Sequence, residues 1–151
     1  MSNLSDHPRL QFTAHVEQPP LRESDIDELQ TRVRELAASR TWTLDAPEVV
    51  VEPPAIPQGA PLVGCVLEVY SALPPWKDRL PRDVDLRQYH EVAALVEVLS
   101  AFSRAKGCVI PCYLGETYVG EIRLGQPDRL LSVGLLGEWR RVLRGDESAL
   151  E

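Results

Sequence analysis

Five segments of the chain have the hydrophobic pattern of short strands. In 10–16 and 63–70, apolar residues alternate with polar or mixed ones, which is typical of strands with one buried face. The mixed second face of 63–70 favours a central strand. The run 48–52 is β-branched and stands between two prolines, so it predicts a short strand. Two further strands, 108–113 and 118–124, flank a glycine-containing turn and predict a hairpin.

Apolar residues recur at helical spacing in three other segments, 24–39, 86–106 and 130–145. Ser24 is predicted to cap the first helix, whose first turn also holds carboxylates that complement the helix dipole. Asp85 is predicted to cap the second helix, with Gln88 at the reciprocal position of a capping box. Gly107 follows the second helix and Gly145 the third, and glycine commonly ends a helix in this way.

The predicted elements follow the order β-α-β-β-α-β, and then a further strand and a helix. The first six match the split βαβ arrangement, in which two helices cover one face of a four-stranded antiparallel sheet. We therefore predict an α+β fold with a ferredoxin-like βαββαβ core, an added C-terminal strand of a hairpin, and a helix. Another α+β arrangement of the same elements is the alternative, and the last helix is free to cover the other sheet face or to pack beside the first two. Residues 1–145 are predicted to form one domain and 146–151 a frayed acidic tail.

The chain has 151 residues with 16 Lys+Arg against 23 Asp+Glu, so its formal net charge is −7. This length suffices for one hydrophobic core without a metal or disulfide. The acidic balance disfavours nucleic-acid phosphates and anionic membranes as partners, and we expect neither. No leader pattern begins the sequence, and no apolar stretch is long enough to cross a bilayer. Because the odd count of three cysteines also suits a reducing compartment, we expect a cytoplasmic protein.

Two of the cysteines, Cys108 and Cys112, share one predicted strand and are four positions apart. At about 3.3 Å per residue they lie about 13 Å apart, too far for one disulfide or one tetrahedral metal site. We expect both, and Cys65, to be small core residues, and we predict no metal ion and no cofactor. Pro111 cannot donate to both neighbouring strands, so its strand is predicted to lie at an edge or to contain a bulge.

No spacing typical of a phosphate-binding loop, a zinc protease or a nucleophile elbow occurs in the chain. A cysteine nucleophile would need a histidine beside it to form the thiolate. His15 is predicted on the polar face of the first strand, whereas Cys65 is predicted on an apolar face. The sequence therefore predicts no catalytic residue.

The leading hypothesis is a small non-catalytic protein that acts by binding another protein. One version is an acidic antitoxin or immunity-type inhibitor that neutralises a basic enzyme such as a nuclease through complementary charge. The predicted contacts are the carboxylates at the start of the first helix and a tryptophan and an arginine in the proline-rich 71–84 loop, namely Glu23, Asp25, Asp27, Glu28, Trp76 and Arg79.

Two alternatives belong to other classes. A small enzyme or ligand-binding domain would have its site on the sheet face or under the 71–84 loop, with His15, Glu68, Tyr70, Asp83 and His90 as candidate contacts. A homodimer would form through an edge strand at 108–113 or through an uncovered sheet face.

Overall fold

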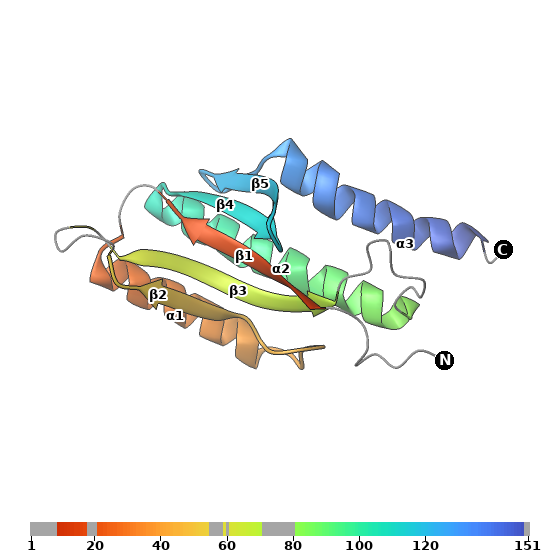
Figure 1. Ribbon diagram of the computed structural model, residues 1–151, viewed down its shortest axis with the longest axis horizontal. Helices are drawn as coiled ribbons and strands as arrows, with labels where there is room; N and C mark the ends of the chain where they lie inside the picture. Colours follow the sequence, from red (N-terminus) through yellow and green to blue (C-terminus); the bar gives the residue numbers. More distant parts are fainter. Residues whose placement is uncertain (1–8, 18–20, 55–58, 60, 71–80, 150–151) are drawn as a thin grey trace.

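The computed structural model describes residues 9–17, 21–54, 59, 61–70 and 81–149, with side chains through 143. It has an α+β fold with a six-stranded antiparallel sheet and three α-helices (Figure 1). The strands are β1 Arg9–Val16, β2 Glu48–Glu52, β3 Leu62–Tyr70, β4 Val109–Leu114, β5 Thr117–Arg123 and β6 Gln126–Pro127. The helices are α1 Glu23–Ala38, α2 Arg82–Lys106 and α3 Glu138–Ala149, and a π-helical segment, η2 Leu130–Gly137, leads into α3.

The strand order in the sheet is β2-β3-β1-β4-β5-β6, and every neighbouring pair is antiparallel. β3 has a neighbour on both sides, which confirms the prediction of a central strand. β4 also lies inside the sheet, between β1 and β5, so the predicted edge position of Pro111 is wrong. The alternative prediction, a bulge, is confirmed, because the β4–β5 register shifts between Cys112 and Tyr113. The irregular pairing at this point accompanies a residue that has no N–H to donate.

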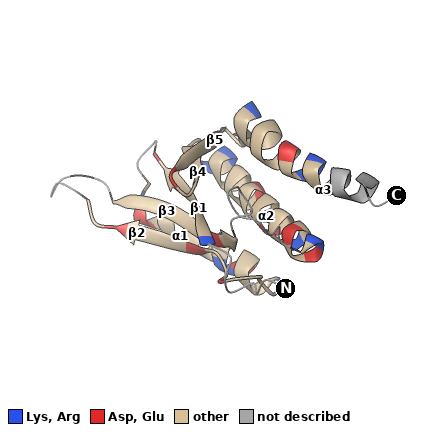
Figure 2. Cartoon of the chain, turned by 45° about the vertical axis from the view of Figure 1, so that its right-hand side comes forward, with Lys and Arg blue, Asp and Glu red and all other residues tan. Residues whose placement is uncertain are grey.

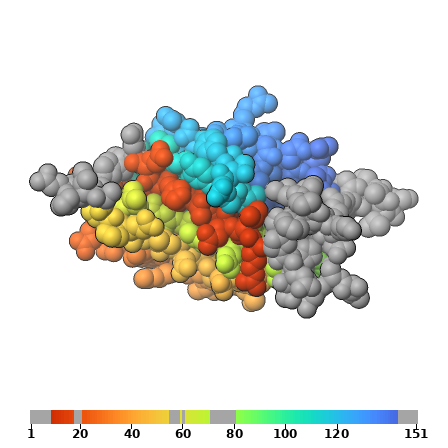
Figure 3. Space-filling model, viewed as in Figure 1, coloured from red at the N-terminus to blue at the C-terminus, as the bar shows by residue number. Residues whose placement is uncertain are grey.

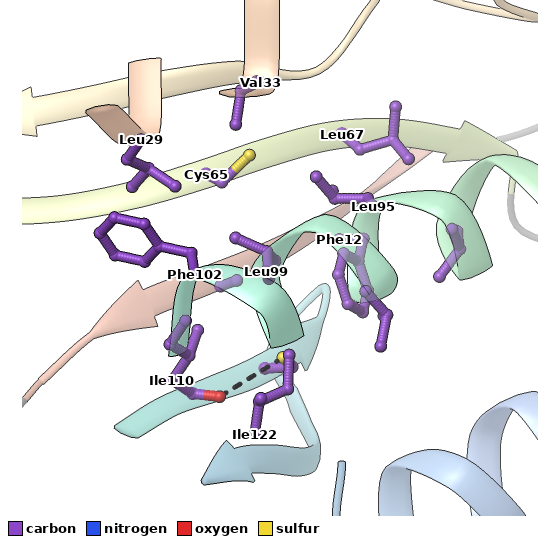
Figure 4. Close-up of a cluster of buried hydrophobic side chains, with 14 of the residues drawn as sticks. Phe12, Leu29, Val33, Cys65, Leu67, Leu95, Leu99, Phe102, Ile110 and Ile122 are labelled. Atoms are coloured by element: carbon purple, nitrogen blue, oxygen red, sulfur yellow. Dashed lines mark hydrogen bonds between the residues drawn. The ribbon is translucent and has the colours of Figure 1, made fainter. Parts of the chain in front are cut away.

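The hydrophobic core lies between the sheet and the two longer helices. In Figure 1 the strands lie in front of α1 and α2. Alternate residues of β1 and β3 point toward these helices, as the period of two requires. Those of β3 are buried along the whole strand, whereas in β1 Phe12 and Ala14 are buried and the residues at the two ends are partly buried. Figure 4 shows the side chains that meet there, among them Phe12, Leu29, Cys65, Leu67, Leu95, Phe102 and Ile110. In the described residues no helix covers the opposite face of the sheet.

Both longer helices begin earlier than the sequence predicts. Arg22 rather than Ser24 is the N-cap of α1, and its backbone N–H donates to Asp25 Oδ2 at 3.1 Å. The carboxylate three positions into the helix therefore does the capping. α2 follows Pro81, which places Asp85 inside the first turn instead of at the cap. Gln88 is not part of a capping box either, because its buried Oε1 accepts the backbone N–H of Tyr70 at 3.0 Å.

The C-terminal helical segment packs beside α2. Trp139 of α3 contacts the first turns of α2 through Tyr89, with ring centroids 5.7 Å apart. Of the two arrangements that the sequence left open, the structure therefore has the one in which the last helix lies beside the others. α3 continues to Ala149, past the end predicted at Gly145.

Candidate functional site

A groove of about 810 Å³ runs over the sheet face opposite the helices. In Figure 3 this face is turned to the viewer, with β1 in red between β3 in yellow-green and β4 and β5 in cyan. The groove is lined by residues of β1, β2, β3 and the β4–β5 hairpin, among them Gln11, Thr13, His15, Glu17, Val50, Glu52, Gly64, Val66, Tyr113 and Glu116. These residues lie on the second face of strands whose first face packs on the core. They are therefore the polar or mixed half of the alternating pattern.

The pairing of the strands brings residues from distant parts of the chain into one row. Thr13 lies opposite Val66 of β3 on one side and opposite Tyr113 of β4 on the other. Tyr113 in turn pairs with Tyr118 of β5, and their rings meet edge to face at 5.7 Å. The floor of the groove is therefore a lateral strip of mixed polar and aromatic side chains.

His15 stands next to this strip. Its ring meets that of Tyr113 edge to face, with centroids 5.7 Å apart. Opposite it on β3 is Gly64, where an added Cβ would come within 3.0 Å of the Ala14 carbonyl oxygen and 3.4 Å of His15 Nδ1. A side chain at position 64 would therefore crowd the Ala14 backbone and the imidazole, and glycine allows the close approach; the His15 side chain itself is exposed.

Negative charge dominates the groove. Three carboxylates, Glu17, Glu52 and Glu116, line it, and no Lys or Arg is among its described lining residues. The arginines elsewhere on this face are paired with neighbouring carboxylates: Arg9 with Glu68 at 3.6 Å and Arg123 with Glu121 at 3.4 Å. Figure 2 shows the two signs over the described residues, with red on β2 and both red and blue on α2 and α3. The groove therefore has an aromatic and polar floor, and no described Lys or Arg pairs with the acidic groups around it.

The predicted partner site at the start of α1 has a different electrostatic setting. Lys106, from the end of α2, lies 3.1 Å from Asp25 Oδ1 and 3.4 Å from Glu28 Oε2. The backbone N–H of Arg22 and this ammonium group hold the pKa of Asp25 below its ordinary value. Glu23 and Asp27 are exposed on the same turns. Trp76 and Arg79, the other predicted contacts, lie outside the described residues.

The candidate contacts of the enzyme alternative do not meet. His15, Glu68 and Tyr70 are on the groove face, but Glu68 lies opposite Gln11, four residues from His15 along β1. That separation is about 13 Å. Asp83 and His90 are exposed on α2, on the other side of the sheet.

All three cysteines are buried and free, as predicted. Burial raises the pKa of Cys65 and of Cys112 to about 12, and it raises the pKa of Cys108 as well. The thiols are therefore protonated at neutral pH and are poor nucleophiles or metal ligands. Within the ranges that the structure describes, no three His, Cys, Asp or Glu side chains are grouped so that they could hold a metal ion.

The sequence did not assign Tyr113 to a site. Tyr113 lies in a predicted strand, but only the lateral order of the strands places it beside His15. The sequence did contain a signal for this site, namely the residues of 10–16 and 108–113 that point away from the core. If the two strands are adjacent, these residues lie on the same face of the sheet.

Comparison with known proteins gives no significant match among protein-family models, curated proteins or solved structures. Among the described helices, none has the length and apolar character needed to cross a membrane. The groove is therefore the feature of this molecule that indicates a function.

Proposed function

We propose that this protein binds a basic partner protein on the helix-free face of its sheet and has no catalytic activity of its own. The observation that carries this proposal is the groove with three carboxylates, Glu17, Glu52 and Glu116, and no described Lys or Arg in its lining. Unmatched negative charge steers a cationic partner and disfavours an anionic one. The specific version is an inhibitor that covers a basic enzyme, such as a nuclease.

The floor of the groove supports a protein ligand. His15 and Tyr113 present ring edges and faces next to Thr13 and Val66, which combines apolar area with hydrogen-bonding groups. Aromatic residues are enriched at the centres of protein interfaces because they bury much area at little conformational cost. The acidic groups around this floor, Glu17, Glu52 and Glu116, then orient the partner and raise the rate of association.

We favour this face over the start of α1, where the sequence suggested the contact. Lys106 already lies against Asp25 and Glu28, so part of that negative charge is neutralised within the molecule. The groove carboxylates have no such cation among the described lining residues. A basic partner therefore has a more favourable electrostatic interaction with the sheet face than with the start of α1.

We further propose that the core is ferredoxin-like. The order β2-β3-β1-β4, entirely antiparallel, supports this, because it is the order that a βαββαβ chain adopts when both helices cross on the same face. β5, β6, η2 and α3 then extend that core at one edge. This arrangement leaves the second sheet face available to a partner.

The test uses a lysine-rich peptide as probe, titrated by fluorescence anisotropy at several salt concentrations. We expect binding that weakens as salt rises, and a loss of affinity on the order of threefold to tenfold in the Glu17→Gln/Glu116→Gln variant. The matched control is Glu35→Gln/Glu97→Gln, which makes the same charge change at exposed positions of α1 and α2. If both variants lose affinity equally, net charge explains the binding and the groove proposal fails.

A further inference from the structure

The outer edge of the sheet at β2 is a second feature with binding potential. β2 pairs with β3 on one side, and no described strand lies beyond it. Its backbone therefore presents N–H and C=O groups that a further strand could pair with. Val50 and Val51 are 38% and 40% exposed, unlike the buried β-branched residues of the core. Pro47 and Pro53 flank the strand, so the available edge is confined to five residues.

The side chains of this edge carry a regular charge pattern. Val49 packs partly against the core, so the alternate residues Glu48, Val50 and Glu52 lie on the open face. Val50 and Glu52 also line the groove. A strand added at this edge would therefore continue the floor of the groove outward.

This pattern disfavours pairing with a second copy of the chain. An antiparallel pair of β2 strands centred on Val50 places Glu48 of each copy opposite Glu52 of the other. A parallel pair in register places each glutamate opposite itself. Like charges directly opposite each other destabilise a strand pair, so both arrangements are unfavourable. A strand with cations at the two matching positions would instead form two favourable pairs.

We propose that the basic partner binds by adding an extended segment to β2, with basic residues four positions apart opposite Glu48 and Glu52 and an apolar residue opposite Val50. This inference rests on the proposed function and specifies how the partner is recognised. Main-chain hydrogen bonds supply the pairing, and the two cations, about 13 Å apart along the strand, supply the selectivity. The added strand runs antiparallel, as every pair in the sheet does.

The first experiment compares two peptides of identical composition. One carries lysines four positions apart with a valine midway, and the other carries the same lysines at adjacent positions. We expect the spaced peptide to bind about fivefold more tightly and the Glu48→Gln/Glu52→Gln variant to lose that preference. Hydrogen exchange followed by NMR should show slower exchange at the β2 amides only with the spaced peptide.

The outcomes separate the two proposals. If both peptides bind with salt dependence and the β2 amides stay unprotected, the edge inference is wrong and the groove proposal stands. If neither peptide binds, both are wrong. If the wild-type β2 amides become protected as the concentration of the protein alone rises, a second copy occupies the edge and the inference is overturned.

The second experiment needs no partner. Glu48→Lys makes the edge self-complementary, because an antiparallel pair then sets a cation opposite Glu52 of the other copy. At equal protein concentration, we expect sedimentation equilibrium to show a larger self-associated fraction for this variant than for the wild type. Glu35→Lys, which reverses the same charge at an exposed position of α1, should behave like the wild type. A Glu48→Lys variant that associates no more than this control would show that the edge does not accept a strand.

Discussion

Trp139 donates its indole N–H to the Oδ1 atom of Asp85 at 2.9 Å, although 54 positions separate them in the chain. The bond joins α3 to the first turn of α2. Tyr89, one turn further along α2, packs edge to face against the same indole. These two contacts, one polar and one aromatic, help to fix the C-terminal helix to the domain, together with the buried side chain of Leu143.

Trp139→Phe should destabilise the protein by about 1–2 kcal/mol, because it keeps a ring against Tyr89 but removes the hydrogen bond to a carboxylate. Urea unfolding measures the loss. A double-mutant cycle with Asp85→Ala isolates the contact, since other effects of each substitution cancel. If the two changes are additive, the hydrogen bond contributes nothing measurable.

Asp128 holds the start of the C-terminal helical segment against β5. Its Oδ1 accepts the backbone N–H of Leu131 at 2.9 Å, and its Oδ2 accepts that of Glu121 at 3.1 Å. Asp128→Ala should cost about 2–4 kcal/mol in urea unfolding, since both partly buried donors lose their acceptor. Asp128→Asn retains one acceptor oxygen and should cost less. Asp45→Ala, at an exposed position, is the matched control, and an equal effect there would contradict the bridging role.

The local hydrophobic pattern predicted most helices and strands of this fold. The spacing of apolar residues, and the prolines and glycines that end an element, can be recognised from neighbouring residues alone. β2 lies at 48–52, as predicted from its β-branched run between prolines. The positive φ of Gly115, +62°, agrees with the predicted hairpin turn. Helix starts were less accurate, since Pro81 and the Asp25 carboxylate offered caps that competed with Asp85 and Ser24.

Features that depend on tertiary contacts could not be predicted from the spacing of residues along the sequence. Glu91 follows the exposed His90 on α2, yet it is 1% exposed and its Oε2 accepts the backbone N–H and the hydroxyl of Thr43. Nothing in the local sequence distinguishes it from a solvated helix residue. A site on the sheet face with His15 was predicted only as an alternative, and Tyr113 was not part of it, because Tyr113 and His15 become neighbours only through the pairing of β4 with β1.

The thiols should be unreactive in the folded protein. Because burial raises the pKa of Cys65 and of Cys112 to about 12, almost no thiolate is present at neutral pH, and burial blocks access as well. Ellman's reagent should therefore label the native protein slowly and all three cysteines rapidly in urea. Rapid labelling of a native thiol would show that the core opens far more readily than this packing implies.

The ion pair between Asp25 and Lys106 should make stability depend on pH at both extremes. Hydrogen bonding to Arg22 N–H and the nearby ammonium lower the pKa of Asp25 below its ordinary 3.8, so its contribution is present above that value and is lost as the pH falls through the folded pKa. The carboxylate raises the pKa of Lys106 above its ordinary 10.5, so the lysine's contribution is present below that value and is lost as the pH rises through the folded pKa.

Asp25→Asn should therefore be less stable than the wild type at neutral pH, and the difference should shrink toward both acid and alkaline conditions. Urea unfolding across the pH range measures it. Asp27→Asn, an exposed position on the same helix, makes the same charge change away from Lys106 and should show a smaller difference at neutral pH. If the two variants follow the same pH curve, the effect belongs to the helix dipole, which acts on both carboxylates, and the ion pair adds nothing to it.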